Sequence, residues 1–235
     1  MAGAGSGSWS PETSDSIILK VLVIGDAATG KTSFVQRYVN GTFQRNYKQT
    51  IGVDFALKIL RWSEGGEGEE QRNCRTTKVQ LWDIAGQERY TSMTRVYYRD
   101  AHGCLILFDV TNRTSFMNVL KWKRDLDAKC VSADSLPIPC ILIANKCDAE
   151  GERAVTGEEI ESLCTEAGFS SWAAVSVRDN VMVDESVKHL IRCILDRDWD
   201  LSAGGGVSRG LKLGAETPQA LASSSARSRC CSRPS

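Results

Sequence analysis

An apolar run, IILKVLVI, leads directly into a glycine-rich segment, GDAATGKT, near the start of the chain. The run has the length of a buried strand, and residues 25–32 fit the pattern G-x-x-x-x-G-K-[ST]. In this pattern glycines let backbone N–H groups approach an anion, and the following helix points its positive end at the same place. The feature therefore predicts a strand, a tight loop and a helix that together bind phosphate.

Two side chains of this segment are expected to carry chemistry. Lys31 should meet the β- and γ-oxygens of a nucleotide and assist catalysis, and the hydroxyl of Thr32 should hold Mg²⁺. The residues expected to contact the nucleotide here are Gly25, Asp26, Ala27, Ala28, Thr29, Gly30, Lys31, Thr32 and Ser33. The pattern also occurs by chance in unrelated proteins. Its meaning depends on whether later motifs supply a magnesium carboxylate, a residue for the attacking water and a base-reading loop.

Composition sets few limits but excludes some classes. Lys+Arg and Asp+Glu number 29 each, so no strong field points to nucleic acid, and we expect none to bind. No apolar run approaches the roughly 20 residues of a membrane span. Neither a signal peptide nor N-myristoylation is expected from the first residues. The chain has nine cysteines, of which the first seven are expected to be free thiols in a reducing compartment.

Short apolar runs alternate with amphipathic stretches from residue 16 onward. Strands are expected at 17–24, 52–62, 77–84, 103–109, 138–144 and 172–176, and helices at 31–40, 88–99, 114–129, 157–167 and 182–197. This order predicts an α/β fold with a mostly parallel sheet, and an antiparallel hairpin where 52–62 and 77–84 have no helix between them. Residues 1–15 are expected to be a disordered leader, 16–198 one domain, and 199–235 a flexible tail. The hairpin connector at 63–76 is expected to be a solvated loop.

The segment WDIAGQE closes one of these strands. A carboxylate at Asp83, facing the phosphate loop, can hold the Mg²⁺ shell. Gly86 can bring its N–H close to a γ-phosphate, and Gln87 can orient an attacking water. Taken alone, an aspartate at a strand end is usually a turn former. Its position after the phosphate loop favours the magnesium role.

The segment NKCD closes another strand. Asp148 can accept two hydrogen bonds from the N1–H and exocyclic amine of guanine, a donor pair that adenine lacks. Asn145 is expected to tie this loop to the phosphate loop, and the stem of Lys146 to lie along the base. Thr50, between the phosphate loop and Asp83, can complete the Mg²⁺ coordination, and Phe43 can stack beside the base. Taken alone, Thr50 reads as an ordinary strand residue and Phe43 as a core aromatic.

Together these residues resemble a Ras-like small GTPase, and more narrowly a Rab. The resemblance covers about residues 16–198 and also includes AAVSVRD, where Ser176 and Val177 resemble the family's third guanine loop. IGVDF, ERYTSMTRVYYRDA and the C-terminal cysteine pair are Rab-like. VDFALK, WDIAGQE and DLDAK are similar to the Rab sub-branch of lysosome-related organelles and the trans-Golgi (the Rab thirty-two and Rab seven-like group). The implied fold is a P-loop NTPase small G domain with a six-stranded, mostly parallel sheet, one antiparallel edge strand and about five helices.

The resemblance implies a GTP-dependent switch with GTP or GDP and Mg²⁺ as ligands. With GTP bound, Thr50 and Gly86 would hold two segments, 41–51 and 85–99, against the γ-phosphate, and hydrolysis would release them. Tyr47 and Arg178 are also expected to contact the nucleotide. Effectors would read Phe55, Trp82 and Tyr97, which otherwise are half-buried core aromatics. The implied partners are an exchange factor, a GTPase-activating protein, Rab escort protein and GDP-dissociation inhibitor, acting on a monomer.

The C-terminus ends CCSRPS, which is similar to the double-cysteine Rab tail. Cys230 and Cys231 would each carry a geranylgeranyl chain, since one lipid chain gives only marginal binding. The alternative is a chance pair in a low-complexity tail. The expected location is the cytoplasmic face of trans-Golgi, endosomal or lysosome-related membranes, with a cytosolic pool.

The phosphate loop departs from the Ras pattern at Ala27 and Ala28, where glycines are usual, and at Thr29. We expect slow hydrolysis without an activating protein. Two further functions stay open. One is a nucleotide-bound trafficking adaptor with little hydrolysis, which Ala28 favours and Gln87 opposes. The other is an ATP-using phosphotransferase, which NKCD opposes.

Overall fold

The structure is a computed structural model that describes residues 16–44, 49–63, 74–86, 94–130 and 136–202. Several expectations lie outside these residues: Tyr47, Gln87, Cys230 and Cys231, the leader, most of the hairpin connector, and the tail beyond Ser202. These expectations stay predictions.

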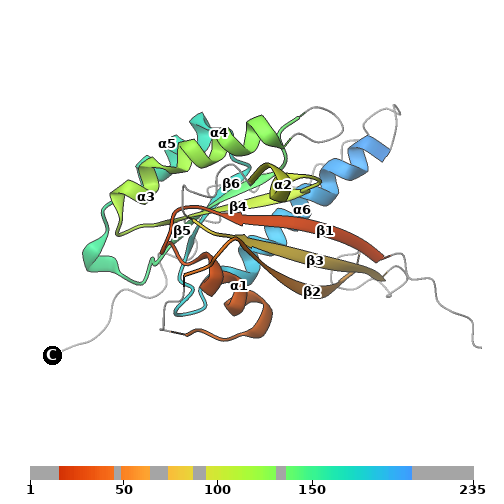
Figure 1. Cartoon of the computed structure of the whole chain (residues 1–235), viewed down its shortest axis with the longest axis horizontal. Coiled ribbons are helices and arrows are strands. Elements are labelled where there is room, and N and C mark those ends of the chain that lie inside the picture. Colours follow the sequence, from red (N-terminus) through yellow and green to blue (C-terminus); the bar gives the residue numbers. More distant parts are fainter. Residues whose placement is uncertain (1–15, 45–48, 64–73, 87–93, 131–135, 203–235) are drawn as a thin grey trace, which may run out of the picture.

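A six-stranded sheet forms the centre of the molecule, in the order β2-β3-β1-β4-β5-β6 (Figure 1). The strands are β1 (Ser16–Ile24), β2 (Val53–Ser63), β3 (Cys74–Ile84), β4 (Gly103–Asp109), β5 (Cys140–Asn145) and β6 (Ser171–Val175). Within this sheet every neighbouring pair is parallel except β2 with β3. The predicted mostly parallel sheet with one antiparallel edge strand is therefore confirmed.

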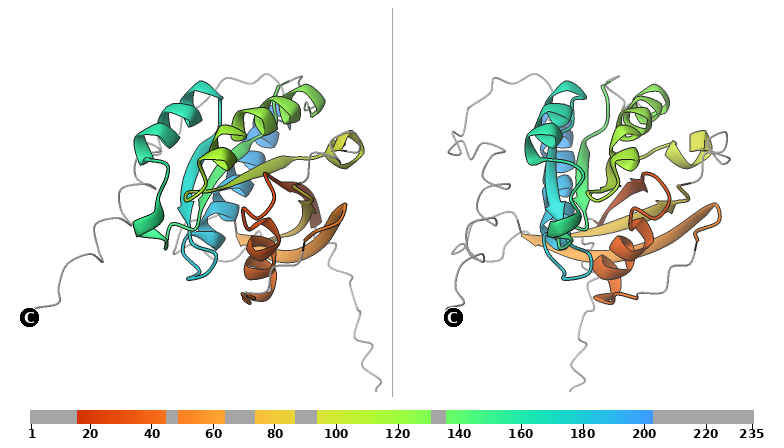
Figure 2. Two further views of the ribbon diagram at one scale, coloured as in Figure 1. Left: turned by 60° about the vertical axis from the view of Figure 1, so that its left-hand side comes forward. Right: turned by 90° about the vertical axis from the view of Figure 1, so that its left-hand side faces the viewer.

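Helices cover both faces of the sheet (Figures 1 and 2). The helices are α1 (Lys31–Asn40), α2 (Thr94–Tyr98), α3 (Arg113–Met117), α4 (Val119–Lys129), α5 (Gly157–Glu166) and α6 (Val183–Ser202), with a short 3₁₀ turn, η2 (Glu150–Glu152). One buried cluster packs the sheet against α1 and α6, and the other packs it against α2 to α5. Within the described residues, no helix combines the length and apolar character needed to cross a membrane.

Alternation along β1 explains the two cores. Leu19, Val21 and Val23 pack on the side of α1 and α6, while Leu22 and Ile24 pack on the side of α2 to α5. Side chains of a strand point to opposite faces in turn, so a strand buried on both faces reads as one continuous apolar run. The run IILKVLVI is therefore the central strand of the sheet.

Two helix boundaries differ from the sequence prediction. The helix expected over 114–129 is divided at Asn118 into α3 and α4, and the Asn118 N–H donates to the carbonyl oxygens of Thr114 and Phe116. The last helix extends to Ser202, beyond the domain end expected at 198. Its apolar side faces the core: Val183, Val187, Leu190, Ile191 and Ile194 are buried, and Leu195 is partly so.

The cysteines in strands behave as predicted. Cys104 and Cys140 lie side by side on β4 and β5, are fully or almost fully buried, and are free thiols. Cys147, in the NKCD segment, is a half-buried free thiol.

Candidate functional site

A pocket of about 290 Å³ lies where the loops that follow β1, β3, β5 and β6 meet. In mostly parallel sheets, ligands bind at the carboxyl ends of the strands. Most of the residues predicted to bind nucleotide line it: Ala27, Ala28, Gly30, Lys31, Thr32, Ser33, Phe43, Thr50, Gly86, Asn145, Lys146, Asp148, Val177 and Arg178. Gln36, Gln44 and Gln49 also line the pocket and were not predicted, because they belong to no motif.

Glycines let the loop after β1 pass close to its neighbours. A Cβ at Gly25 would lie 2.1 Å from the carbonyl oxygen of Leu107, and one at Gly30 would lie 2.3 Å from Nδ2 of Asn145. Gly30 also has a φ of 95°, in the left-handed region, at the point where α1 begins. A side chain at either position would displace the loop, which explains the glycines of the pattern.

Gly86 packs against the same loop from the end of β3. A Cβ there would come within 2.4 Å of the backbone nitrogen of Ala27. Only glycine allows this approach, so the segment after β3 and the phosphate loop are in direct backbone contact. The approach of the Gly86 N–H to a γ-phosphate stays a prediction.

Lys31 lines the pocket and is 6% exposed. Its Nζ donates a hydrogen bond to the backbone oxygen of Asp26 at 2.6 Å. Burial lowers the pKa of Lys31 to about 8, while the charges of Asp83 and Asp26 oppose the shift. A buried ammonium whose bonded partner is a neutral carbonyl favours an anion close by, because an anion restores the charged form.

The three predicted magnesium ligands meet at the end of β3. The Thr32 hydroxyl donates to Oδ2 of Asp83 at 2.5 Å and lies 2.8 Å from the Thr50 hydroxyl. Burial raises the pKa of Asp83, and the Thr32 bond and the Lys31 charge oppose that shift. The second carboxylate oxygen, Oδ1, is buried and has no partner among the described residues. One carboxylate and two hydroxyls are hard oxygen donors, so this set fits Mg²⁺.

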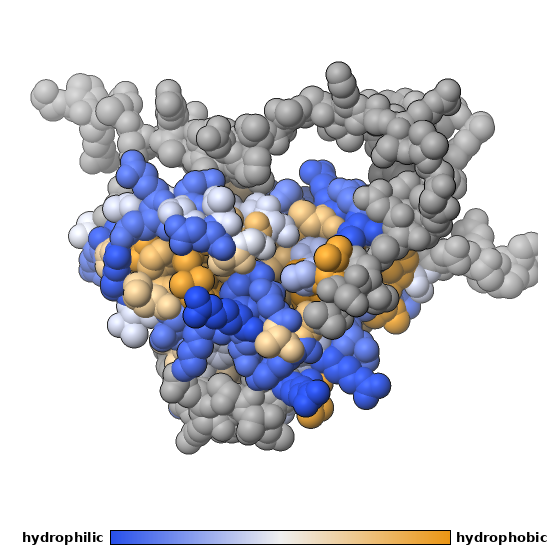
Figure 3. Space-filling view, turned by 90° about the horizontal axis from the view of Figure 1, so that it is seen from above, coloured by the Kyte–Doolittle hydropathy of each residue, from blue (hydrophilic) through white to orange (hydrophobic). Residues whose placement is uncertain are grey.

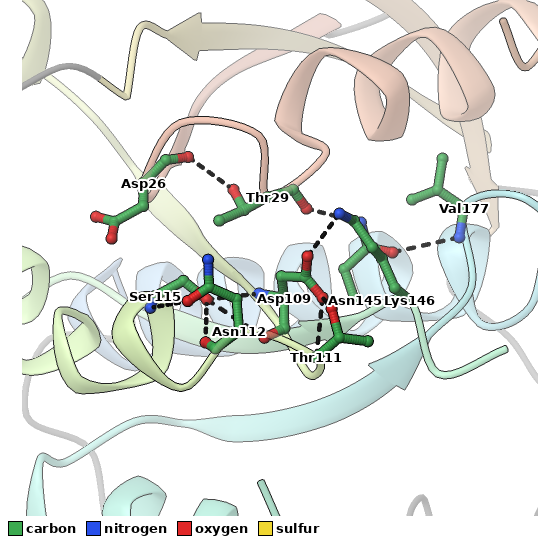
Figure 4. A network of polar contacts seen from close by, with 9 residues as sticks. All are labelled: Asp26, Thr29, Asp109, Thr111, Asn112, Ser115, Asn145, Lys146 and Val177. Carbon is green, nitrogen blue, oxygen red and sulfur yellow. Dashed lines mark hydrogen bonds and ion pairs between the residues drawn. The ribbon is translucent and has the colours of Figure 1, made fainter. Parts of the chain in front are cut away.

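Asn145 joins the two ends of the pocket (Figure 4). Its Nδ2 donates to the backbone oxygen of Thr29 at 2.8 Å, and its Oδ1 accepts from the N–H of Val177 at 3.4 Å. One buried amide thus connects the phosphate loop with the loops after β5 and β6. The tie that the sequence predicts between the first two loops is present.

Asp148 is oriented by two neighbours on the loop after β6. Its Oδ1 accepts from the Ser176 hydroxyl at 2.7 Å, and its Oδ2 lies 3.7 Å from Nη1 of Arg178. Ser176 does not line the pocket itself; it is fully buried and holds the residue that does. A carboxylate fixed at the pocket wall can accept two parallel N–H bonds from guanine.

Comparison with known proteins agrees with this geometry. A model of the Ras family matches residues 20–196. The chain is 51% identical to Ras-related protein Rab-7L1 of Homo sapiens over 174 residues, which is 74% of this chain and 81% of that protein. It is 40% identical to Ras-related protein Rab-32 of Homo sapiens over 240 residues, covering 98% of this chain and 100% of the other. The chain belongs to the Ras family.

Within that family it is a Rab-32/Rab-7-like small GTPase. Ras-family GTPases bind GTP, GDP and Mg²⁺ and hydrolyse GTP. Rab proteins in general work with exchange factors, activating proteins, a GDP-dissociation inhibitor and effectors.

A second polar network in this Ras-family chain went unpredicted. Asp109, the last residue of β4, forms an ion pair with Lys146 at 2.5 Å (Figure 4). Its other carboxylate oxygen accepts bonds from the N–H and hydroxyl of Thr111. The backbone of Lys146 has a φ of 66°, in the left-handed region. The ion pair with Asp109 fixes the position of the Lys146 side chain. The one available signal was an aspartate at a strand end, which is also a common turn residue.

The aromatic residues expected to face effectors do lie together. The Phe55 and Trp82 rings are 4.4 Å apart and perpendicular, and the Trp82 and Tyr97 rings are 6.5 Å apart. Phe55 is 52% exposed, whereas Trp82 and Tyr97 are half-buried. Leu57 and Ile59 continue the exposed apolar side of β2. The side of the molecule with α2 to α5 is mostly hydrophilic with hydrophobic areas between (Figure 3).

Proposed function

We propose that this Ras-family GTPase is a switch in intracellular membrane trafficking that is active with GTP bound. The observation that carries the proposal is the meeting of Thr32, Thr50 and Asp83 beside the pocket. Thr50 comes from a loop remote in sequence from the other two. A γ-phosphate and its metal would therefore tie that loop to the phosphate loop, and hydrolysis would release it.

The residues around the phosphate end have separate tasks. Lys31 would pair with the β- and γ-oxygens, while Thr32, Thr50 and Asp83 would hold Mg²⁺ directly or through water. When bound, the metal supplies positive charge that offsets the negative charge developing on the phosphate oxygens. Gly86 allows a backbone N–H near the γ-phosphate, and Gln87, outside the described residues, is proposed to orient the attacking water.

The base end would select guanine. Asp148 accepts from the two donors of the guanine edge, Lys146 lies beside the base, and Phe43 borders the same pocket. Phe43 also packs on the core below α1, with the Arg37 guanidinium 5.7 Å from its ring. Its position is therefore set by the fold before any base is bound.

Hydrolysis by the chain alone should be slow, on the order of 10⁻⁴ s⁻¹. Among the described residues that line the pocket, Arg178 is the arginine present, and it sits at the base end beside Asp148. It therefore does not lie at the phosphate end, where an arginine finger would act on the γ-phosphate. We propose that an activating protein supplies that charge.

We further propose membrane attachment through geranylgeranyl groups on Cys230 and Cys231. Each buried CH₂ contributes about 0.8 kcal/mol, so two chains hold a protein where one is marginal. The proposed location is the cytoplasmic face of trans-Golgi, endosomal or lysosome-related membranes. Mass spectrometry of the protein from cells tests the attachment, and unmodified thiols at both positions would remove it.

Release of bound nucleotide by denaturation tests the switch. We expect GTP and GDP in the released fraction, and adenine nucleotides would contradict the base assignment. Single-turnover hydrolysis of loaded GTP then tests catalysis. Gln87→Leu should slow it further, and an unchanged rate would remove Gln87 from the mechanism.

One observation favours a second function, an adaptor that holds nucleotide with little hydrolysis. Ala28 has a φ of 62°, a conformation that costs a side-chain-bearing residue free energy, at the loop that faces the phosphates. If GTP is retained for hours without decay while effectors still bind, the adaptor describes the chain better than the switch.

A further inference from the structure

Asp26, the second residue of the phosphate loop, is the centre of four hydrogen bonds. Its backbone oxygen accepts from the Thr29 hydroxyl at 2.9 Å and from Lys31 Nζ at 2.6 Å. Its carboxylate accepts from Nδ2 of Asn118 at 2.7 Å and from the indole Nε1 of Trp122 at 2.7 Å. Each carboxylate oxygen therefore has its own donor, and both donors come from outside the loop.

The two donors belong to one rigid part of the fold. Asn118 stands at the break between α3 and α4, and Trp122 follows one helical turn later on α4. Residues four apart on a helix lie one above the other, so both reach the same side. Trp122 is 8% exposed and packs in the core together with Val119 and Leu126. The donors are thus fixed by the packing of α4.

The direction of the carboxylate matters because of its charge. A negative group in a phosphate loop repels a bound polyphosphate if it turns toward the pocket. Ala27 and Ala28, which follow directly, line the pocket, but Asp26 does not. Bonds to Asn118 and Trp122 hold the charge on the α4 side and leave the backbone of the loop facing the pocket.

We propose that Asn118 and Trp122 are positioning residues of the nucleotide site. They hold the phosphate loop in its binding shape through the Asp26 carboxylate, and so slow the release of nucleotide. The inference rests on the proposed guanine-nucleotide binding and extends it to two residues that no motif of the site includes.

The test compares two substitutions of the same kind in the full-length chain loaded with Mg²⁺ and a fluorescent GDP. Trp122→Phe removes one indole N–H donor from a carboxylate and keeps an aromatic ring in the core. We expect about tenfold faster GDP release, the usual effect of losing a hydrogen bond to a charged group. Trp172→Phe is the matched control. It removes an indole bond to Glu161 on the surface, and we expect release within about twofold of wild type. Equal release from the two variants overturns the proposal.

A double-mutant cycle separates positioning from a general loss of stability. In an Asp26→Ala background the indole has no carboxylate to hold, so Trp122→Phe should add less than about twofold to the release rate. Additive effects of Asp26→Ala and Trp122→Phe overturn the proposal. Asn118→Ala, which leaves the core aromatic untouched, should also speed release, by about threefold to tenfold. An unchanged rate in that variant counts against it equally.

The bond itself has a spectroscopic signature. Trp122→Phe identifies the indole N–H resonance of Trp122 in a proton–nitrogen spectrum. Asp26→Ala should move that resonance and leave the resonance of Trp172 in place. An unmoved Trp122 resonance overturns the inference. A wild-type chain that holds no guanine nucleotide overturns the proposed function as well, whereas normal binding with unaltered release in Trp122→Phe overturns this inference alone.

Discussion

At the base end of the pocket, the polar groups are hydrogen-bonded to one another within the chain. At the phosphate end, some buried polar groups have no partner among the described residues. At the base end, Asn145 uses both its amide groups, and Asp148 is bonded to Ser176. At the phosphate end, Oδ1 of Asp83 has no partner among the described residues, and Lys31 has a lowered pKa. Buried polar groups cost free energy unless they are bonded.

The hydrogen bonds of the base end therefore form on folding, whereas those of the phosphate end are completed only when the ligand binds. The fold already satisfies the base end, so substitutions there should reduce the free energy of unfolding. The phosphate end gains its missing partners from phosphate and metal, so substitutions there should reduce ligand affinity more than stability. The following predictions test that separation, from the largest expected effect to the smallest.

Thr32→Val should have the largest effect, and on binding. The change keeps the shape of the side chain but removes the hydroxyl that contacts Asp83 and Thr50. We expect affinity for Mg²⁺–GTP to fall by about a hundredfold to a thousandfold, since a buried carboxylate and its metal lose a shared partner. The free energy of unfolding without nucleotide should change by only about 1 kcal/mol. Titration calorimetry with and without Mg²⁺ measures the first quantity.

The matched control is Thr165→Val on α5. That hydroxyl bonds the Glu161 backbone at an exposed position, and its loss should leave affinity unchanged. If Thr32→Val lowers stability more than affinity, the phosphate end is not the ligand-dependent half.

Asn145→Ala should act mainly on stability. Without the amide, the Thr29 oxygen and the Val177 N–H lose partners in a buried place. We expect the free energy of unfolding of the nucleotide-free chain to fall by about 2 kcal/mol, measured by urea denaturation. Asn40→Ala, at the exposed end of α1, should change it by less than about 0.5 kcal/mol. If Asn145→Ala lowers the free energy of unfolding only with nucleotide bound, the base end, and not the phosphate end alone, depends on the ligand.

Asp109→Asn should give a smaller effect. It is the exception at the base end and should act on nucleotide release, because its partner Lys146 itself lines the pocket. The substitution keeps an oxygen for Thr111 but removes the charge that pairs with Lys146. The Lys146 side chain is 42% exposed, so solvent limits the pair to about 1 kcal/mol or less, or roughly threefold to fivefold faster GDP release. Asp125→Asn breaks a comparable pair with Lys129 on α4 and should leave release unchanged.

Much of this site follows from the sequence because strand ends are easy to find. Asp83 and Asn145 each lie at the end of a strand expected from the sequence, and a parallel sheet brings such ends to one edge. Thr50 could be assigned only with the help of the family resemblance, since a threonine before a strand does not by itself indicate a metal ligand. The antiparallel edge followed from two apolar runs with no helix between them.

The residues that hold the loops from behind could not be predicted in this way. The Trp122 indole meets Asp26 across 96 positions of chain, and no local pattern encodes so distant a contact. The break at Asn118 is equally hidden, because buried Phe116, Val119 and Trp122 continue one helical spacing through it. Hydrophobic periodicity reports which side of a segment is buried, and it does not report a change in backbone hydrogen bonding.

The smallest predicted effect concerns Ala28 and Ala27. Ala28 has a φ of 62°, where a Cβ is unfavourable, and Ala27 is not among the described residues with positive φ. Ala28→Gly should therefore raise the free energy of unfolding by roughly 0.5 kcal/mol, because relief of the strained conformation exceeds the added freedom of the unfolded chain. Ala27→Gly should lower it by a similar amount, because only the unfolded-state term applies.

If the two substitutions change the free energy of unfolding in opposite directions, backbone strain, and not merely the loss of a methyl group, sets the effect. Both residues line the pocket, so the same pair of variants also tests the adaptor. If strain at Ala28 restrains hydrolysis, Ala28→Gly should speed single-turnover GTP decay by about twofold to fivefold while Ala27→Gly does not, since about 1 kcal/mol of strain corresponds to that range. Equal rates in wild type and Ala28→Gly would mean that the loop tolerates the strain without an effect on hydrolysis. The slow rate would then be assigned to the lack of an arginine at the phosphate end among the described residues.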